Sequence, residues 1–369
     1  MKNLKELTNS ELLAYKQRLE NDVSKYHNWQ LSKKIELNSA YGALGNEYFR
    51  FFDVRLAEAI TLSGQLVIQW IANSVNRYLN SLLKTSNVEY VFYCDTDSIY
   101  ITLGELVKKT YSNSIPEDTN KVVTVLDKFC ETRLQKVIND SCDNLQEYLN
   151  CRTQKMQMKR ESIADRGIWT AKKRYILNVY DNEGVRYDSP KLKMQGIEAI
   201  KSSTPEICRD KIAEAIKIIL NKRQEDLHKF IDDFKIEFEK LSPEDIGFPR
   251  GCNGITKYSQ SNDAKLYKLG TPAHTKGAII YNGLLKKNAL DKKYQYIQDG
   301  DKIKFLYLKE PNPTHDSVIS ILDVLPKEFN LHNYINYNTQ FEKSFLDPLR
   351  YILDAVKWTT KKTASFANL

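Results

Sequence analysis

Two aspartates, Asp95 and Asp97, lie one residue apart in EYVFYCDTDSIYITL (residues 89–103), a stretch that otherwise favours strands. Aspartate is uncommon in strands, and two like charges this close repel each other. The β-branched and aromatic residues on both sides predict a β-hairpin with the aspartates at its tip. Side chains two apart on a strand point to one face. Carboxylates that converge in this way suit a divalent cation, which would also remove the repulsion.

Two other interpretations fit a DTDS segment. An ordinary turn with two solvated aspartates needs no ligand at all. A calcium loop of the EF-hand type also begins in this way, but it requires glycine at its sixth position and glutamate at its twelfth. Those positions hold Tyr100 and Leu106, so the calcium loop is rejected.

A second polar group lies in KKIELNSAYGALGN (residues 33–46). Lys34, Asn38 and Tyr41 have the i, i+4, i+7 spacing of one helix face. Lysine suits phosphate, asparagine both donates and accepts hydrogen bonds, and tyrosine offers a flat ring with a polar tip. Gly42 has no side chain, so a ligand can approach the backbone closely there. The alternative is a solvated polar stripe on an amphipathic helix.

The elements around these residues are expected to be helices first and strands later. Hydrophobic periodicity predicts helices over about residues 8–25, 28–45, 54–84 and 121–150. Strand-like runs follow at 155–162, 172–181, 185–188 and 190–198, with DNEG (181–184) as a hairpin turn. Helices are then expected from Ser-Ser-Thr-Pro (202–205) to about 241 and over 341–358, with 245–310 irregular. The predicted fold class is α+β, with an antiparallel sheet backed by helices.

Composition excludes several classes of protein. With 41% hydrophobic and 28% charged residues, the 369-residue chain can bury real cores. No run approaches about 18 apolar residues and the N-terminus lacks a signal-peptide pattern, so we expect no membrane span and no export. The six cysteines form no CxxC pair and predict reduced, mostly packed thiols. The net charge of +8 permits a polyanionic partner without requiring one.

The two polar motifs together resemble a known family. KIELNSAYG is similar to the K-x3-N-S-x-Y-G motif of family B DNA polymerases, and YCDTDSIYI is similar to their D-T-D-S motif, in the same order. KKRY (172–175) follows in the place of that family's K-K-R-Y element. KMQGIE and SSTP resemble the end of the palm and the start of the thumb in T-even-type phage replicative polymerases. FPRGCNGITKY and GTPAHTKGAIIYNGLL extend the resemblance more loosely toward the C-terminus.

This resemblance implies three domains and one reaction. Residues 1–46 would be a fingers fragment, 47–203 the palm and 204–369 the thumb. The reaction would be transfer of a nucleotide from a dNTP to a primer on template DNA, with two Mg²⁺ ions. Asp97 and Asp95 would be metal ligands, Asp97 being the better supported.

Further site residues come from the same resemblance. Glu161 would be another palm carboxylate near the metals, although Lys159 stands where phage members have an additional aspartate. Lys34 and Asn38 would contact the incoming triphosphate. Tyr41 would lie against the nascent base pair, with Gly42 giving clearance.

Basic residues would hold the primer–template duplex. The KKRY element supplies Lys172, Lys173, Arg174 and Tyr175 on a predicted strand; an exposed basic strand edge is the alternative. In the thumb, basic residues interleaved with Tyr258 and Tyr281 suit phosphate contacts. They are Arg250, Lys257, Lys276, Lys286 and Lys287.

One part of the family pattern is missing. The family carries a further metal-binding aspartate in D-x-x-S-L-Y-P and an exonuclease domain, and residues 1–369 contain neither. We therefore expect the C-terminal subunit of a split polymerase, inactive without an N-terminal partner chain, in the cytoplasm of an infected bacterial cell. A piece of a longer protein and a catalytically inactive DNA-binding accessory protein are the alternatives. The tail KKTASFANL, through Phe366 and Leu369, resembles a sliding-clamp-binding tail; a disordered tail is its alternative.

Overall fold

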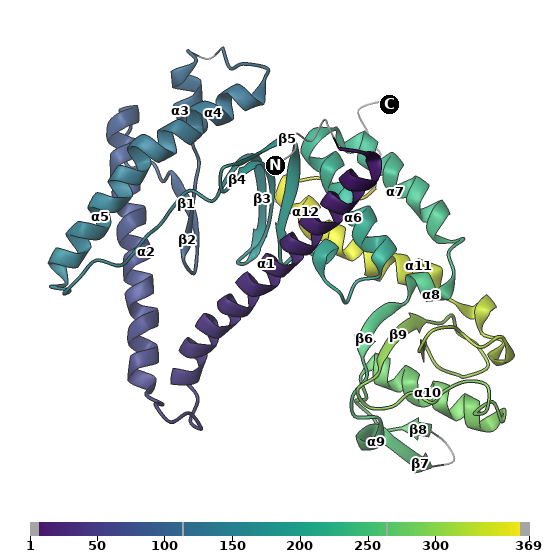
Figure 1. The fold of residues 1–369 in the computed structure, drawn as a ribbon. Coiled ribbons are helices and arrows are strands. Elements are labelled where there is room, and N and C mark those ends of the chain that lie inside the picture. The colour runs from purple at the N-terminus through teal and green to yellow at the C-terminus, as the bar shows by residue number, and fades with distance from the viewer. Residues whose placement is uncertain (1–6, 113, 263–264, 362–369) are drawn as a thin grey trace. The chain divides into compact units, whose positions relative to one another are not determined.

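The computed structural model describes residues 7–112, 114–262 and 265–361. Its contacts divide the chain into two compact units (Figure 1). The first unit is Met1–Pro116 with Lys128–Arg160, and the second is Glu117–Asp127 with Glu161–Leu369. The predicted α+β class with antiparallel sheets is confirmed. The predicted division into fingers, palm and thumb has boundaries at 46/47 and 203/204, which differ from those of the two units, and it stays a prediction.

The first unit begins with one long helix where two were predicted. The helix α1 (Asn9–Leu44) runs for 36 residues, starts with a capping box between Thr8 and Glu11, and ends at Gly45. No glycine or proline lies between the two predicted segments, so nothing interrupts the backbone hydrogen bonds. None of its residues is buried. The helix therefore offers its whole circumference to other molecules or segments.

The helix α2 (Val54–Leu83) forms the core of the first unit, as predicted. Ile71, Val75, Leu79 and Leu83 are buried at intervals of four residues, which is one helix face. They pack with α5 (Gln135–Tyr148), which continues from α4 (Thr119–Phe129) through the π-type turn η2 (Cys130–Leu134). The first turns of α2 are exposed instead.

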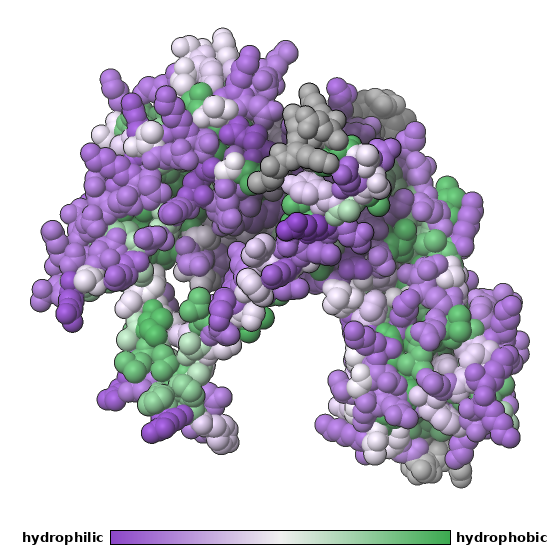
Figure 2. Space-filling model, viewed as in Figure 1, coloured by the Kyte–Doolittle hydropathy of each residue, from purple (hydrophilic) through white to green (hydrophobic). Residues whose placement is uncertain are grey.

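Exposed apolar residues gather where α1 leads into α2. Phe51, Val54 and Leu56 are each more than half exposed. Figure 2 shows this hydrophobic group over the connection and the beginning of α2. Monomeric proteins seldom leave such a contiguous group in water, so it indicates a contact surface.

A short hairpin packs on α2. It consists of β1 (Val91–Asp95) and β2 (Ser98–Ile101), and α3 (Gly104–Thr110) follows it. The side-chain oxygen of Asn76 accepts hydrogen bonds from the backbone N–H groups of Tyr90 at 2.9 Å and Val91 at 2.8 Å. Asn80, one turn later, pairs with both the N–H and the carbonyl of Val88. These amides fix the start of β1 against α2.

The second unit contains a three-stranded meander in the order β3-β4-β5. The strands are β3 (Ser162–Ala171), β4 (Arg174–Asn182) and β5 (Val185–Gln195). The DNEG turn is confirmed, since Glu183 and Gly184 take positive φ between β4 and β5. The strand predicted over 155–162 is wrong, because that segment is a loop up to Ser162. The two runs at 185–188 and 190–198 form one strand rather than two.

Helices cover this sheet and build the rest of the core. The helices α6 (Glu206–Asn221) and α7 (Gln224–Phe238) are confirmed, as is the C-terminal helical run. That run comprises α11 (Tyr337–Phe341), the π-type turn η6 (Glu342–Leu346) and α12 (Asp347–Val356), and α12 packs on β3 (Figure 1). The rings of Phe234, Phe341 and Phe345 pack together between these helices in tilted and edge-to-face contacts.

The described residues of 245–262 and 265–310 form several helices and strands, so the prediction of irregular structure there is wrong. This region contributes β6 (Phe248–Gly251) and β9 (Lys302–Tyr307) to a sheet completed by β10 (Val318–Ile321). The helix α10 (Ala273–Lys287) lies against this sheet, and Gly277 allows it to approach Ser320 closely. Smaller elements are α8 (Pro243–Ile246), α9 (Ile255–Tyr258), β7 (Ser259–Asn262) and β8 (Lys265–Tyr267).

Four of the six cysteines, Cys130, Cys142, Cys208 and Cys252, are buried, and all six are free thiols. Burial raises the pKa of Cys208 to about 11. A helix of sufficient length and apolarity to traverse a lipid bilayer does not occur in the described part of the chain.

The contact between α2 and the hairpin can be tested with Asn76→Ala. The substitution leaves the N–H groups of Tyr90 and Val91 without their acceptor, so we expect the free energy of unfolding to fall by about 2–4 kcal/mol. Urea unfolding followed by tyrosine and tryptophan fluorescence measures the change. Asn73→Ala, on the exposed face of the same helix, is the matched control, with an expected change within about 0.5 kcal/mol. Equal losses in both variants would contradict this role of Asn76.

Candidate active site and nucleic-acid interface

The predicted carboxylate hairpin is confirmed. In the register of β1 and β2, Asp95 lies opposite Ser98, which leaves Thr96 and Asp97 as a two-residue turn. Thr96 takes the left-handed conformation with φ 52°. Asp97 lies in this turn and not on the strand, so the strand alternation used to aim both aspartates at one point does not apply to it. The turn nevertheless keeps the two residues together at the tip.

The two aspartates of the hairpin differ in exposure and in hydrogen bonding. The Asp95 carboxylate is half-buried and accepts a hydrogen bond from the Thr96 hydroxyl at 3.0 Å, while its carbonyl accepts from the Asp97 N–H and the Ser98 hydroxyl. The Asp97 side chain is exposed. The rings of Tyr93 on β1 and Tyr100 on β2 make a tilted contact across the hairpin, with centroids 5.2 Å apart. Asp95 is thus oriented by its own turn, and Asp97 faces solvent.

These residues fit part of a divalent-cation site. Carboxylate oxygens are the ligands that Mg²⁺ prefers, and this ion keeps several waters or phosphate oxygens as further ligands. Among residues 7–112, 114–262 and 265–361, however, no group of three or more acidic, histidine or cysteine side chains could hold a metal. Asp95 and Asp97 are therefore a candidate pair of ligands and not a complete set.

The predicted polar face of α1 is present and solvent-exposed. Lys34, Asn38 and Tyr41 all lie on exposed positions of this one helix, and Tyr41 is 42% exposed. A Cβ built on Gly42 would meet nothing within 4 Å, which leaves the clearance that the sequence predicted. The neighbouring Lys33 is paired with Glu36 at 2.8 Å. The helix thus presents lysine, amide and ring to the same side of the chain.

Glu161 has a partner that the sequence did not reveal. It lies just before β3 in the second unit, whereas the two aspartates belong to the first. The ammonium group of Lys193, on β5, forms an ion pair with its carboxylate and also donates to the Ser162 hydroxyl at 3.2 Å. Lys193 is the first residue of KMQGIE, 32 residues after Glu161, and its spacing from Glu161 gives no local signal of the contact.

The KKRY element is a turn followed by a strand. Lys172 and Lys173 form the two-residue connection between β3 and β4, and Lys173 has φ 59°. The prediction that all four residues lie on a strand is therefore wrong for the two lysines and holds for Arg174 and Tyr175, which begin β4. Tyr175 is only 7% exposed and stacks on Trp169. The two lysines are exposed.

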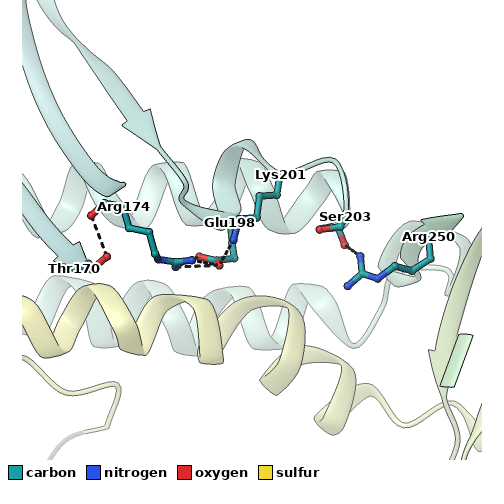
Figure 3. A network of polar contacts seen from close by, with 6 residues as sticks. All are labelled: Thr170, Arg174, Glu198, Lys201, Ser203 and Arg250. Carbon is teal, nitrogen blue, oxygen red and sulfur yellow. Dashed lines mark hydrogen bonds and ion pairs between the residues drawn. The ribbon is translucent and has the colours of Figure 1, made fainter. Parts of the chain in front are cut away.

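Arg174 is engaged inside the second unit. Its guanidinium group donates three hydrogen bonds of 2.7–3.0 Å to the Glu198 carboxylate, a contact drawn in Figure 3. Arg250 similarly donates to the carbonyl oxygens of Ser203 at 2.7 Å and Pro249 at 2.9 Å. Burial lowers the pKa of Arg250. Both arginines therefore contact the protein through the groups that were expected to contact DNA.

Lys276 is also engaged. Its ammonium group forms an ion pair with Asp316, which is buried and accepts a further hydrogen bond from the Tyr267 hydroxyl. Burial by itself lowers the pKa of Lys276, but the hydrogen bonds to Asp316 and Tyr267 outweigh it and the pKa is raised. Tyr281, expected among the DNA-facing tyrosines, is 2% exposed and belongs to the core. Phe366 and Leu369 lie outside the described residues.

Comparisons with known proteins agree with the motifs. The family model described as DNA polymerase family B matches residues 10–355. The chain is 36% identical over 354 residues to a DNA-directed DNA polymerase of Escherichia phage RB69 and 34% identical over 348 residues to one of Enterobacteria phage T4. These matches cover 92% and 91% of this chain but only 38% of each phage protein. A DNA polymerase beta of African swine fever virus (isolate Tick/Malawi/Lil 20-1/1983) is 27% identical over 49% of this chain and 14% of its own length.

The ion pair of Lys276 predicts a loss of stability in Lys276→Ala. The substitution leaves the Asp316 carboxylate, 8% exposed, without its cation, so we expect the free energy of unfolding to fall by about 2–3 kcal/mol. Lys287→Ala, at an exposed position of the same helix, is the control and should change it by less than about 0.5 kcal/mol.

The same contact sets a pH dependence for this stability difference. Because the pKa of Lys276 is raised above 10.5, its stabilisation is fully present below pH 10.5 and is lost as the pH rises through the raised value. Chemical unfolding at several alkaline pH values should therefore show wild type and Lys276→Ala converging. A constant difference up to the highest pH would contradict this assignment.

Proposed function

The chain belongs to DNA polymerase family B, and we propose that it forms the C-terminal part of a template-directed DNA polymerase. The observation that carries the proposal is the DTDS hairpin, which presents Asp95 and Asp97 together at its tip within a chain similar to two DNA-directed DNA polymerases over nine-tenths of its length. The substrates would be primer–template DNA and a dNTP. The place of action would be the cytoplasm of an infected bacterial cell, in keeping with the phage relatives.

We propose that Asp95 and Asp97 hold Mg²⁺. When bound, the two ions would lower the pKa of the primer 3′-hydroxyl and neutralise charge on the leaving pyrophosphate. The exposed Asp97 carboxylate can reach an ion without displacing protein contacts. The Thr96 hydroxyl bond orients the half-buried Asp95 carboxylate, so its lone pairs are directed before an ion arrives. As the family resemblance implies, Glu161 would be a further palm carboxylate, and Lys193 partly offsets its charge.

We assign the incoming nucleotide to α1. The Lys34 ammonium group would neutralise charge that grows on the triphosphate during transfer, and Asn38 would hydrogen-bond to it. The Tyr41 ring would pack on the nascent base pair, with Gly42 leaving room for it. All four residues are exposed on one helix that buries nothing else, which supports a role outside the core.

We further propose that a partner chain supplies the rest of the site, including the aspartate of the D-x-x-S-L-Y-P motif. Two observations support a large missing contact surface. Leu13, Val23 and Leu37 of α1 are more than two-thirds exposed. The apolar group at the start of α2 is exposed as well (Figure 2). Clamp binding through Phe366 and Leu369 remains part of this proposal.

Asp97→Ala tests the metal assignment. In the complex of this chain with its N-terminal partner, we expect primer extension with Mg²⁺ and dNTPs to fall on the order of 10³-fold, because a carboxylate that holds the ions is lost. Glu105→Gln, an exposed carboxylate in the same unit, should extend primers at the wild-type rate. If the wild-type pair makes no product, while salt-sensitive duplex binding persists in Asp97→Ala, the chain is an inactive DNA-binding accessory protein instead.

Lys34→Ala tests the nucleotide assignment. We expect a higher KM for dNTP together with a lower kcat, on the order of 10²-fold in kcat/KM, since the lysine would act on charge present in the substrate and larger in the transition state. Steady-state primer extension over a range of dNTP concentrations measures both constants. The adjacent Lys33→Ala removes the same charge from a residue already paired with Glu36, and it should leave both constants unchanged. Equal effects of the two variants would refute the assignment of Lys34.

A further inference from the structure

The turn between β3 and β4 holds Lys173 in an unfavourable backbone conformation. Its φ of 59° lies in the left-handed region, which residues other than glycine, asparagine and aspartate seldom adopt. Such a conformation persists only where surrounding contacts enforce it. The contacts around this turn therefore show which residues keep Lys173 in this conformation.

The end of β5 supplies one of these contacts. Gly196, with φ +65°, lies so close to the turn that a Cβ built on it would overlap the carbonyl oxygen of Lys173 and touch the Arg174 side chain. Only glycine can adopt this conformation and leave this space without strain. The segment after β5 thus packs directly beneath the lysine turn.

The second contact is the ion pair of Arg174 and Glu198. Arg174 follows the turn directly, and Glu198 follows Gly196 by two residues, so the pair joins the same two segments (Figure 3). The two side chains are 26% and 18% exposed. Burial alone raises the pKa of Glu198, but hydrogen bonds from Arg174 and Lys201 lower it by more, so it is charged at neutral pH. A bidentate pair of this kind has a fixed geometry.

The Glu198 segment is itself held from the other side. Arg250 of β6 donates to the carbonyl oxygen of Ser203, at the far end of the same connection to α6 (Figure 3). Ile197, beside Glu198, is fully buried. The backbone on both sides of Glu198 is therefore held in place, and its carboxylate can keep Arg174 in a fixed position.

We propose that Glu198 is a positioning residue that, through Arg174 and above Gly196, holds the Lys172–Lys173 turn so that both ammonium groups meet the phosphates of duplex DNA. This inference rests on the proposed function, which supplies the duplex as ligand. The proposal implies that the acidic side chain of Glu198 strengthens DNA binding. An acid near a phosphate site would otherwise only repel DNA, so the sign of its effect identifies the role.

The test measures binding of the full chain to a primer–template duplex at several salt concentrations. We expect Glu198→Gln to weaken binding about tenfold at low salt and to reduce the slope of log K against log salt by up to about 1.8, the contribution of two phosphate contacts. Glu206→Gln, an exposed acid on the first turn of α6, is the matched control and should leave binding unchanged or slightly tighter. In an Arg174→Gln background, Glu198→Gln should have no further effect. Tighter binding by Glu198→Gln, or additive losses in the double variant, would overturn the proposal.

Hydrogen exchange separates this inference from the proposed function. In peptides that cover residues 168–178, Glu198→Gln should speed exchange about tenfold without DNA, because the turn loses a charged hydrogen bond that keeps it closed. Unchanged exchange would overturn the positioning role whether or not the chain binds DNA. If Glu198→Gln exchanges faster but the wild-type chain binds no duplex, the positioning role stands and the assignment of DNA as the ligand fails. The proposed function then fails with it.

Discussion

The carboxylate hairpin depends on hydrogen bonds that no strand provides. A two-stranded hairpin is marginal in water, and among the described residues β1 pairs with β2 alone. The side chain of Asn76 accepts the N–H groups of both Tyr90 and Val91, and the apolar stripe of α2 packs beneath them. The position of Asp95 and Asp97 thus follows from one amide on a helix. A polar residue in the middle of an apolar helix would otherwise weaken it.

The hairpin also explains how two like charges are tolerated. Asp95 is half-buried and oriented by Thr96, while Asp97 stays in water, so neither carboxylate loses its solvation completely. A fully buried pair would have to bind a proton or a cation in order to fold. This arrangement leaves the exposed Asp97 carboxylate accessible to an external ion, and it fits a site that is completed by other groups.

Local features were predictable from the sequence, whereas contacts between distant segments were not. Alternation and turn letters predicted the hairpin at Asp95 and the DNEG turn, and periodicity predicted α2, since these depend on residues within one or two turns. Nothing in the sequence indicated that Lys193 pairs with Glu161 or that Glu198 pairs with Arg174, because each contact joins segments more than twenty residues apart. The β6–β9 sheet was missed for the same reason. The predicted strand also included Lys172 and Lys173, which form the turn before β4, because no glycine, asparagine or proline marks that turn in the sequence.

The basic residues fall into two physical groups, and this division bears on DNA binding. Arg174, Arg250 and Lys276 are partly buried and bonded to protein acceptors, so moving any of them to a phosphate would leave a protein carboxylate or carbonyl without this donor. Lys172 and Lys173 are exposed in the turn between β3 and β4, at positions that a phosphate group of DNA could reach. A positive charge in the sequence is therefore not in itself a DNA contact. In the second unit, the partly buried cations hold protein segments together, and the exposed lysines of the turn are the better candidates for contacts with phosphate.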